Sequence, residues 1–144
     1  MTLKIVIAPQ SFKGNISALE AARAIERGVL TAEPDAQTVL APVADGGDGT
    51  LDALVEGTGG QYIRSIVTGP LGKALEATWG VMGDGRTAVV EMARASGLAL
   101  VPPQRRDPRI TTTRGTGEII KEALDRGYDR IIVGLGGSAT NDGG

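Results

Sequence analysis

The stretch Val43-Ala44-Asp45-Gly46-Gly47-Asp48-Gly49-Thr50 joins an apolar run, residues 38–43, to a short segment whose apolar residues have helical spacing. Glycine lets the main chain adopt positive φ angles and lets a ligand approach it closely. A helix that begins after such a loop presents free N–H groups and the positive end of its dipole. We therefore expect an anion-binding loop, in which Asp45 and Asp48 could hold a hard cation. The alternative is structural: Asp48 or Thr50 caps the helix, and the glycines only form the turn.

The composition restricts the chemistry that the chain can perform. Its 144 residues include no cysteine and no histidine, so thiolate nucleophiles, disulfides and the commonest general base are excluded. The remaining groups are carboxylates, lysine, hydroxyls and backbone amides, with a hard metal such as Mg²⁺. This inventory suits phosphoryl transfer, in which positioning and charge stabilisation matter more than a tuned base.

Length and charge indicate an ordinary globular chain. A length of 144 residues favours one domain, and the net charge of −2 argues against a partner such as nucleic acid or an anionic membrane. No apolar segment is long enough to span a bilayer or to act as a signal peptide. We expect a cytoplasmic protein that acts on small molecules, and the sequence leaves its oligomeric state open.

The first 60 residues follow a β-α-β pattern. Residues 4–8 are expected to form a buried strand and residues 38–43 a second strand. Between them, Ser17-Ala18-Leu19-Glu20 is a capping box that opens a helix. This alternation predicts a parallel sheet whose ligand edge lies at the carboxyl ends of its strands. Lys13 lies in the first loop at that edge, either as a solvated surface residue or as a ligand for an anion.

Residues 61–105 have a different pattern. Three apolar segments, at residues 62–68, 74–82 and 87–92, are separated by short glycine-containing turns. Short connections predict antiparallel pairing. We expect this part to form a separate lobe, or an insertion into the parallel sheet.

The last part of the chain returns to the alternating pattern. We expect a helix over residues 118–126 and a buried strand over residues 130–135. The core face of the helix should consist of Ile119, Ile120, Ala123 and Leu124. A glycine-rich loop then follows the strand without the helix that such a loop normally precedes. We therefore expect a fragment of a longer protein that is incomplete at its C-terminus and inactive by itself.

Two short motifs are typical of other nucleotide-binding proteins. Gly72-Lys73-Ala74 is similar to the end of a P-loop, but Ala74 stands where that motif has Ser or Thr. The run from Gly134 to Ala139 fits the G-x-G-x-x-A pattern of dinucleotide-binding loops. A nicotinamide-cofactor domain is therefore an alternative, as is a non-catalytic binding fragment.

Five motifs in order resemble the signatures of the bacterial glycerate kinase family, which phosphorylates D-glycerate with ATP. They are Pro9-Gln10-Ser11-Phe12-Lys13-Gly14, Pro42-Val43-Ala44-Asp45-Gly46-Gly47-Asp48-Gly49-Thr50, Val67-Thr68-Gly69-Pro70-Leu71-Gly72, Gly115-Thr116-Gly117-Glu118 and Gly136-Gly137-Ser138-Ala139-Thr140-Asn141-Asp142-Gly143-Gly144. The resemblance covers the whole chain but only the N-terminal part of a family member. It implies an α/β enzyme with a Rossmann- or flavodoxin-like parallel sheet and an inserted second α/β lobe rich in antiparallel strands. Residues 1–60 and 106–144 would form the Rossmann-like lobe, and residues 61–105 the start of the inserted lobe.

The resemblance also implies a reaction and a site. ATP with Mg²⁺ would be the donor and 2-phosphoglycerate the product, with 3-phosphoglycerate left open. Asp45 and Asp142 are the expected catalytic carboxylates, and Asp48 or Asp142 could hold the metal. The expected substrate- and nucleotide-binding positions are Ser11, Lys13, Gly46, Gly47, Asp48, Gly49, Thr50, Thr116, Gly136, Gly137, Ser138 and Asn141. The family usually has Asp where this chain has Gln10, which keeps a hydrogen-bonding amide but loses the charge.

Overall fold

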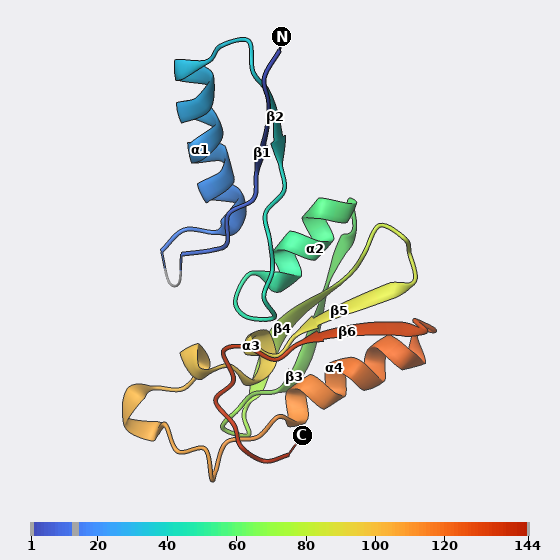
Figure 1. Ribbon diagram of the computed structural model, residues 1–144. Coiled ribbons are helices and arrows are strands. Elements are labelled where there is room, and N and C mark those ends of the chain that lie inside the picture. Colours follow the sequence, from blue (N-terminus) through green and yellow to red (C-terminus); the bar gives the residue numbers. More distant parts are fainter. Residues whose placement is uncertain (1, 13–14, 144) are drawn as a thin grey trace. The chain divides into compact units, whose positions relative to one another are not determined.

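The structure is a computed structural model that describes residues 2–12 and 15–143 (Figure 1). The chain divides into two compact units, Met1–Ala44 and Asp45–Gly144, and each is considered by itself. Lys13, one of the expected binding residues, lies outside the described residues. No helix in the described part of the chain is both long enough and apolar enough to cross a membrane.

The first unit is the expected β-α-β element. Strand β1 (Lys4–Ile7) pairs in parallel with β2 (Gln37–Leu40), and helix α1 (Ala18–Ala32) connects them. The predicted capping box is confirmed, because the backbone N–H of Glu20 donates to Ser17 Oγ and the N–H of Ser17 donates to Glu20 Oε2. The expectation that the first strand is buried is wrong: Ile7 is the buried residue of β1.

The second unit holds a four-stranded sheet with helices around it. Its elements are α2 (Thr50–Thr58), β3 (Gln61–Thr68), β4 (Ala74–Val81), β5 (Thr87–Glu91), α3 (Ala93–Ser96), the short 3₁₀ helices η1 (Leu98–Leu100) and η2 (Pro103–Arg105), α4 (Arg114–Asp125) and β6 (Arg130–Gly134). The strand order is β3-β4-β5-β6. Pairing is antiparallel between β3, β4 and β5, as the short connections predict, and parallel between β5 and β6. The mixed α/β class is therefore confirmed.

Strand β6 pairs with β5, and the expected division of the chain into lobes stays a prediction. The sequence pattern assigned residues 106–144 to the lobe of residues 1–60, whereas β6 lies beside β5, with Thr87 opposite Arg130 and Glu91 opposite Gly134. The boundary between the compact units lies between Ala44 and Asp45. The alternation of strand and helix predicts that β6 has a parallel neighbour, but it does not reveal which strand that neighbour is.

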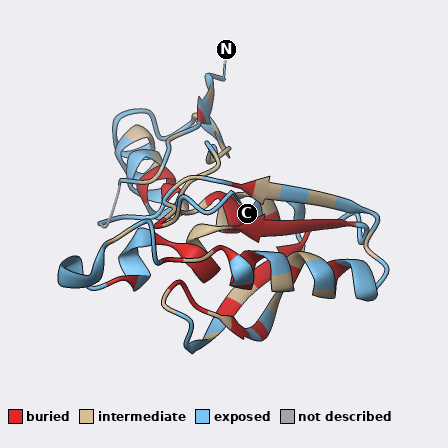
Figure 2. Cartoon of the chain, turned by 90° about the horizontal axis from the view of Figure 1, so that it is seen from below, coloured by how far each residue is buried: buried red, intermediate tan, exposed pale blue. Residues whose placement is uncertain are grey.

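Strand β5 lies at the centre of the core of the second unit. All of its residues are buried (Figure 2), and its side chains alternate between two apolar clusters. Ala88 and Val90 pack with Trp79 on the side covered by α3 and α4, whereas Val89 packs with Leu51 on the side covered by α2 (Figure 1). The sheet is thus covered by helices on both faces, which explains the continuous apolar run of this strand.

Two elements near the end of the chain differ in detail from expectation. Strand β6 lies at the sheet edge and alternates in exposure, with Ile132 at 39% of its full accessibility, so the expected fully buried strand is wrong. Helix α4 begins at Arg114 rather than at residue 118. Its residues Ile119 and Ala123 are buried as expected, but Leu124 is 56% exposed.

Candidate active site

Two glycine-rich loops of the second unit meet backbone to backbone. The first glycine loop (residues 45–49) precedes α2, and the second glycine loop (residues 135–143) follows β6. The N–H of Gly136 donates to the carbonyl oxygen of Gly46 at 2.7 Å. A Cβ atom at position 136 would lie 2.5 Å from the Cα of Gly47, so a side chain has no room there. Glycine is required at this position because the two main chains touch.

Hydrogen bonds within the first loop use the amides that were expected to receive an anion. The N–H of Gly47 donates to Asp45 Oδ1 at 2.9 Å, and the N–H of Gly46 donates to Thr50 Oγ1 at 3.0 Å. With the bond from Gly136 and a bond from Gly49 to Glu91, four of the five glycines expected at the binding site already donate their amides within the protein. These glycines therefore contribute mainly a compact backbone, and anionic groups of a ligand need other donors.

The N-terminus of α2 is capped by a residue that the sequence did not single out. Glu91, at the end of β5, is 2% exposed, and its Oε2 accepts hydrogen bonds from the N–H groups of Gly49 at 3.1 Å and Leu51 at 2.9 Å. Gly49 is the N-cap residue, with a φ of 91° and no side-chain cap of its own. The helix end that was expected to hold a ligand anion thus holds the carboxylate of Glu91, and the hydroxyl of Thr50 accepts from Gly46. The sequence signal that could have identified Glu91 is its position at the end of an apolar strand, because a buried charge needs hydrogen-bond partners.

Arg94 extends this cap into a polar network. Its Nε donates to Glu91 Oε1 at 3.2 Å, and its NH2 group donates to Asp52 Oδ2 at 2.7 Å. Burial opposes the charge of Arg94, but Asp52 and Glu91 together outweigh it and raise the pKa of the guanidinium. The hydroxyl of Tyr62 donates to Asp52 as well, and burial followed by the charge of Asp52 raises the pKa of Tyr62. The network joins the first turn of α2 to the end of β5.

The second loop is held along α3 and η1. The N–H of Leu98 donates to the carbonyl oxygen of Gly137, and the N–H of Ala139 donates to that of Ser96. The hydroxyl of Thr111 donates to the carbonyl oxygen of Ala139 at 2.6 Å. No helix follows β6 within the described residues up to 143, so the G-x-G-x-x-A pattern does not lie at a strand-to-helix turn there.

A polar pocket with a volume of about 390 Å³ opens beside the second loop. It is lined by Met92, Thr113, Leu135, Ser138, Thr140, Asn141, Asp142 and Gly143. Both oxygens of the Asp142 carboxylate lie within hydrogen-bonding distance of Thr113, whose N–H donates to Oδ2 at 2.7 Å. The hydroxyls of Ser138 and Thr140 are 2.9 Å apart. Hydroxyl, amide and carboxylate groups therefore converge in one place, as binding of a small polar molecule requires.

The structure brings some of the expected site residues together and places others elsewhere. Ser138, Asn141 and Asp142 line the pocket, and Asp45 to Gly49 lie in the loop that adjoins it through Gly136. Thr116 is 4% exposed, and its hydroxyl pairs with that of Ser96, so the structure places it in the core rather than in the pocket. Thr50 is also buried. Ser11 belongs to the first unit.

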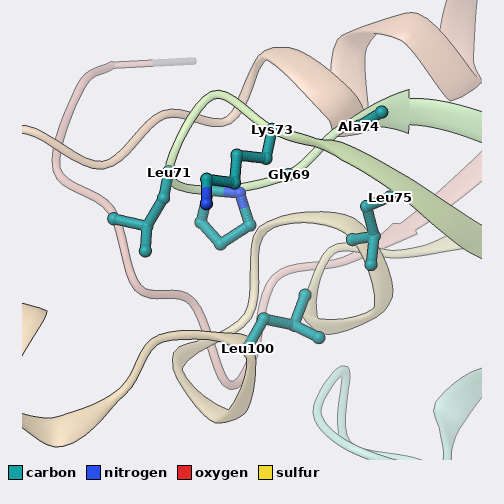
Figure 3. Close-up of a pocket in the computed structure, with 7 residues that line it drawn as sticks. Gly69, Leu71, Lys73, Ala74, Leu75 and Leu100 are labelled. Atoms are coloured by element: carbon teal, nitrogen blue, oxygen red, sulfur yellow. The ribbon is translucent and has the colours of Figure 1, made fainter.

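A second, smaller pocket has a different character. Its volume is about 150 Å³, and Leu71, Leu75 and Leu100 are among the residues that line it (Figure 3). Lys73 also lines it, from the turn between β3 and β4. Gly72-Lys73-Ala74 therefore connects two antiparallel strands, whereas a P-loop connects a strand to a helix.

Comparison with known proteins gives consistent matches over the chain. The pattern of the family described as "Glycerate kinase family" matches residues 5–144. The chain is 62% identical over 142 residues to a glycerate kinase of Bacillus subtilis and 58% identical to a glycerate 2-kinase of Escherichia coli. Each alignment covers 99% of this chain and 37% of the relative.

A solved structure agrees with these matches. The crystal structure of a candidate glycerate kinase 2 from Salmonella typhimurium LT2 superimposes with a TM-score of 0.87 at 56% identity. The superposition covers 100% of this chain and 38% of that protein, so the chain spans somewhat over a third of the length of its relatives. On these grounds, the chain belongs to the glycerate kinase family.

Proposed function

We propose that the enzyme at the full length of these relatives transfers the γ-phosphoryl group of ATP to a hydroxyl of D-glycerate. The product is 2-phosphoglycerate, since a relative at 58% identity is named a glycerate 2-kinase, and 3-phosphoglycerate is the alternative product. The observation that carries the proposal is the bond between Gly136 and Gly46, which joins a carboxylate-bearing loop to a polar pocket. The reaction consumes ATP, and the cytoplasm is the compartment that we propose for it.

The roles of the two principal carboxylates follow from their surroundings. Asp142 lines the pocket and is fixed by two groups of Thr113, which suits a carboxylate that must keep one orientation toward a substrate. Asp45 lies in the adjoining loop, where its Oδ1 is oriented by the N–H of Gly47. We assign Asp45 to orienting the acceptor hydroxyl and Asp142 to holding the Mg²⁺ ion that would neutralise the negative charge on the transferred group.

The described residues could bind Mg²⁺ only together with ligands from the substrate and from water. They include no cluster of three carboxylates that could hold a metal by themselves. Mg²⁺ in kinases is commonly bound through one or two carboxylates, the phosphates and water. Asp142 or Asp48 would supply the protein ligand, and the ion would neutralise charge on the phosphates of ATP.

Donors for the anionic groups come from side chains, because most of the glycine amides are engaged. Ser138, Thr140 and Asn141 offer hydroxyl and amide groups in the pocket. The ammonium group of Lys13 would neutralise a carboxylate or a phosphate, and Ser11 comes from the same motif.

Calorimetric titration separates this function from a nicotinamide-binding one. The full-length enzyme is titrated separately with ATP plus Mg²⁺, with D-glycerate and with NAD. We expect heats of binding for ATP and glycerate and none for NAD. Binding of NAD without ATP would instead favour the G-x-G-x-x-A interpretation of residues 134–139.

A further inference from the structure

Glu91 is a buried carboxylate to which the proposed reaction gives no role. It is two residues beyond Val89 on β5 and therefore on the same face of the sheet, which α2 covers. At 2% exposure its charge has lost most of its hydration. Such a group is retained in a core only with strong hydrogen-bond partners.

The partners of Glu91 are the end of the first glycine loop and one arginine. Its Oε2 accepts from the amides of Gly49 and Leu51, on either side of the residue where α2 begins. Its Oε1 accepts from Arg94, which also binds Asp52 in the first turn of α2. The junction between loop and helix is thus attached to β5 and α3 by charged hydrogen bonds, which are stronger than neutral ones.

The same end of β5 also contacts the second loop. Met92, the residue after Glu91, donates its N–H to the carbonyl oxygen of Gly134 at 2.9 Å, and it lines the pocket together with residues of the second loop. Gly134 in turn approaches Gly46, since a Cβ atom on Gly134 would lie 2.8 Å from the Gly46 carbonyl oxygen. Residues 91 and 92 therefore contact the end of the first loop, at Gly49, and the end of β6, at Gly134, from which the second loop continues.

We propose that Glu91 and Arg94 are positioning residues, which hold the first glycine loop in the geometry that places Asp45 beside the pocket. This inference rests on the proposed function for its kinetic consequences, but not for its structural ones. Loss of the carboxylate would leave the amides of Gly49 and Leu51 without this acceptor and let the loop shift. A shift of about 1 Å in a catalytic group is enough to reduce turnover by about a hundredfold.

The test compares Glu91→Gln, Glu91→Ala and Arg94→Lys with a matched control. Gln keeps an oxygen for the amides of Gly49 and Leu51 but removes the charge that pairs with Arg94. The control is Asp84→Asn at the opposite end of β5, where Asp84 likewise accepts from two backbone amides, those of Arg86 and Thr87. Steady-state kinetics on the full-length enzyme are measured well below the Tm of every variant, together with hydrogen exchange of the Gly49 and Leu51 amides.

We expect kcat to fall about tenfold in Glu91→Gln and about a hundredfold in Glu91→Ala, with KM changed much less. Exchange at Gly49 and Leu51 should accelerate in both variants, and Arg94→Lys should keep part of the activity. Asp84→Asn should retain wild-type kcat even though its Tm falls. If Glu91→Ala does not fold, Glu91→Gln and Arg94→Lys decide the question.

Two other outcomes separate this inference from the proposed function. Wild-type kcat and unchanged amide exchange in both Glu91→Gln and Arg94→Lys would overturn the positioning role. A wild-type enzyme that does not phosphorylate glycerate would refute the proposed function instead. In that case the exchange of Gly49 and Leu51 still decides whether Glu91 holds the loop.

Discussion

The N–H of Gly136 donates to the carbonyl oxygen of Gly46 at 2.7 Å, and this bond joins the two loops that carry most of the candidate site residues. Gly136 lies so close to Gly47 that a side chain at position 136 would prevent this contact. The loops come from positions some ninety residues apart in sequence, and the shared backbone contact sets the distance between their side chains. The first prediction therefore concerns this glycine.

Gly136→Ala should separate the two loops. A Cβ atom there would lie 2.5 Å from the Cα of Gly47, and a backbone atom cannot move aside as a flexible side chain would. We expect a loss of about 1–3 kcal/mol in the free energy of unfolding, typical of overpacking, and at least a tenfold lower kcat/KM. Gly57→Ala in α2 is the control, because nothing lies within 4 Å of its Cβ position, and it should gain about 0.5–1 kcal/mol. Chemical denaturation and steady-state assays measure both effects, and wild-type behaviour of Gly136→Ala would show that the loops can relax.

Asp45→Asn should lower kcat by about a hundredfold or more. The amide oxygen of Asn can still accept from Gly47, so the loop geometry should survive and only the charge is lost. Turnover at saturating ATP and glycerate is the measurement, with a circular dichroism spectrum as the control for folding. Normal turnover would mean that Asp45 serves the turn and not the reaction.

Asp142 and Thr113 should act as a pair. Asp142→Asn removes the charge from the pocket, whereas Thr113→Val removes one hydrogen bond to the carboxylate and leaves the backbone one. We expect a loss of about a hundredfold in kcat for Asp142→Asn and about tenfold for Thr113→Val. Equal losses in both variants would indicate that orientation of the carboxylate matters more than its charge.

Asp84 should make the stability of the second unit depend on pH. Hydrogen bonds from the Thr87 hydroxyl and from the backbone N–H groups of Arg86 and Thr87 lower the pKa of Asp84 from 3.8 to about 2. A lowered pKa in the folded state stabilises the protein above the unfolded value, and this contribution is lost as the pH falls through the folded value. The Tm difference between wild type and Asp84→Asn should thus be full above pH 3.8 and shrink as the pH falls toward about 2. A difference that stays constant over this range would contradict the assignment.

Much of the local structure could be predicted because it depends on neighbouring residues. The capping box of Ser17 and Glu20, the antiparallel strands with short turns, and the ion pair between Glu122 and Arg126 follow from spacing alone. The early start of α4 could not be predicted from propensity, because Gly115 disfavours a helix. Packing requires glycine there, since a Cβ atom would lie 2.1 Å from the carbonyl oxygen of Thr68.

The two loops of the candidate site could be predicted from the sequence, but the residues that hold them in place could not. The glycine runs identified both loops, since local composition marks them. Glu91 was missed because its partners, Gly49 and Leu51, are about forty residues away and contact it only through the tertiary fold. Thr116 shows the converse: its motif indicated a ligand, but tertiary packing directs its hydroxyl to Ser96.

The most direct test of the account is the product of the reaction itself. The full-length enzyme is incubated with D-glycerate, ATP and Mg²⁺, and the phosphorylated product is identified by ³¹P NMR against authentic 2- and 3-phosphoglycerate. We expect ATP-dependent formation of 2-phosphoglycerate, which slows by about a hundredfold or more when Asp45 is replaced by Asn. A folded enzyme that binds ATP but transfers no phosphoryl group to glycerate would contradict it.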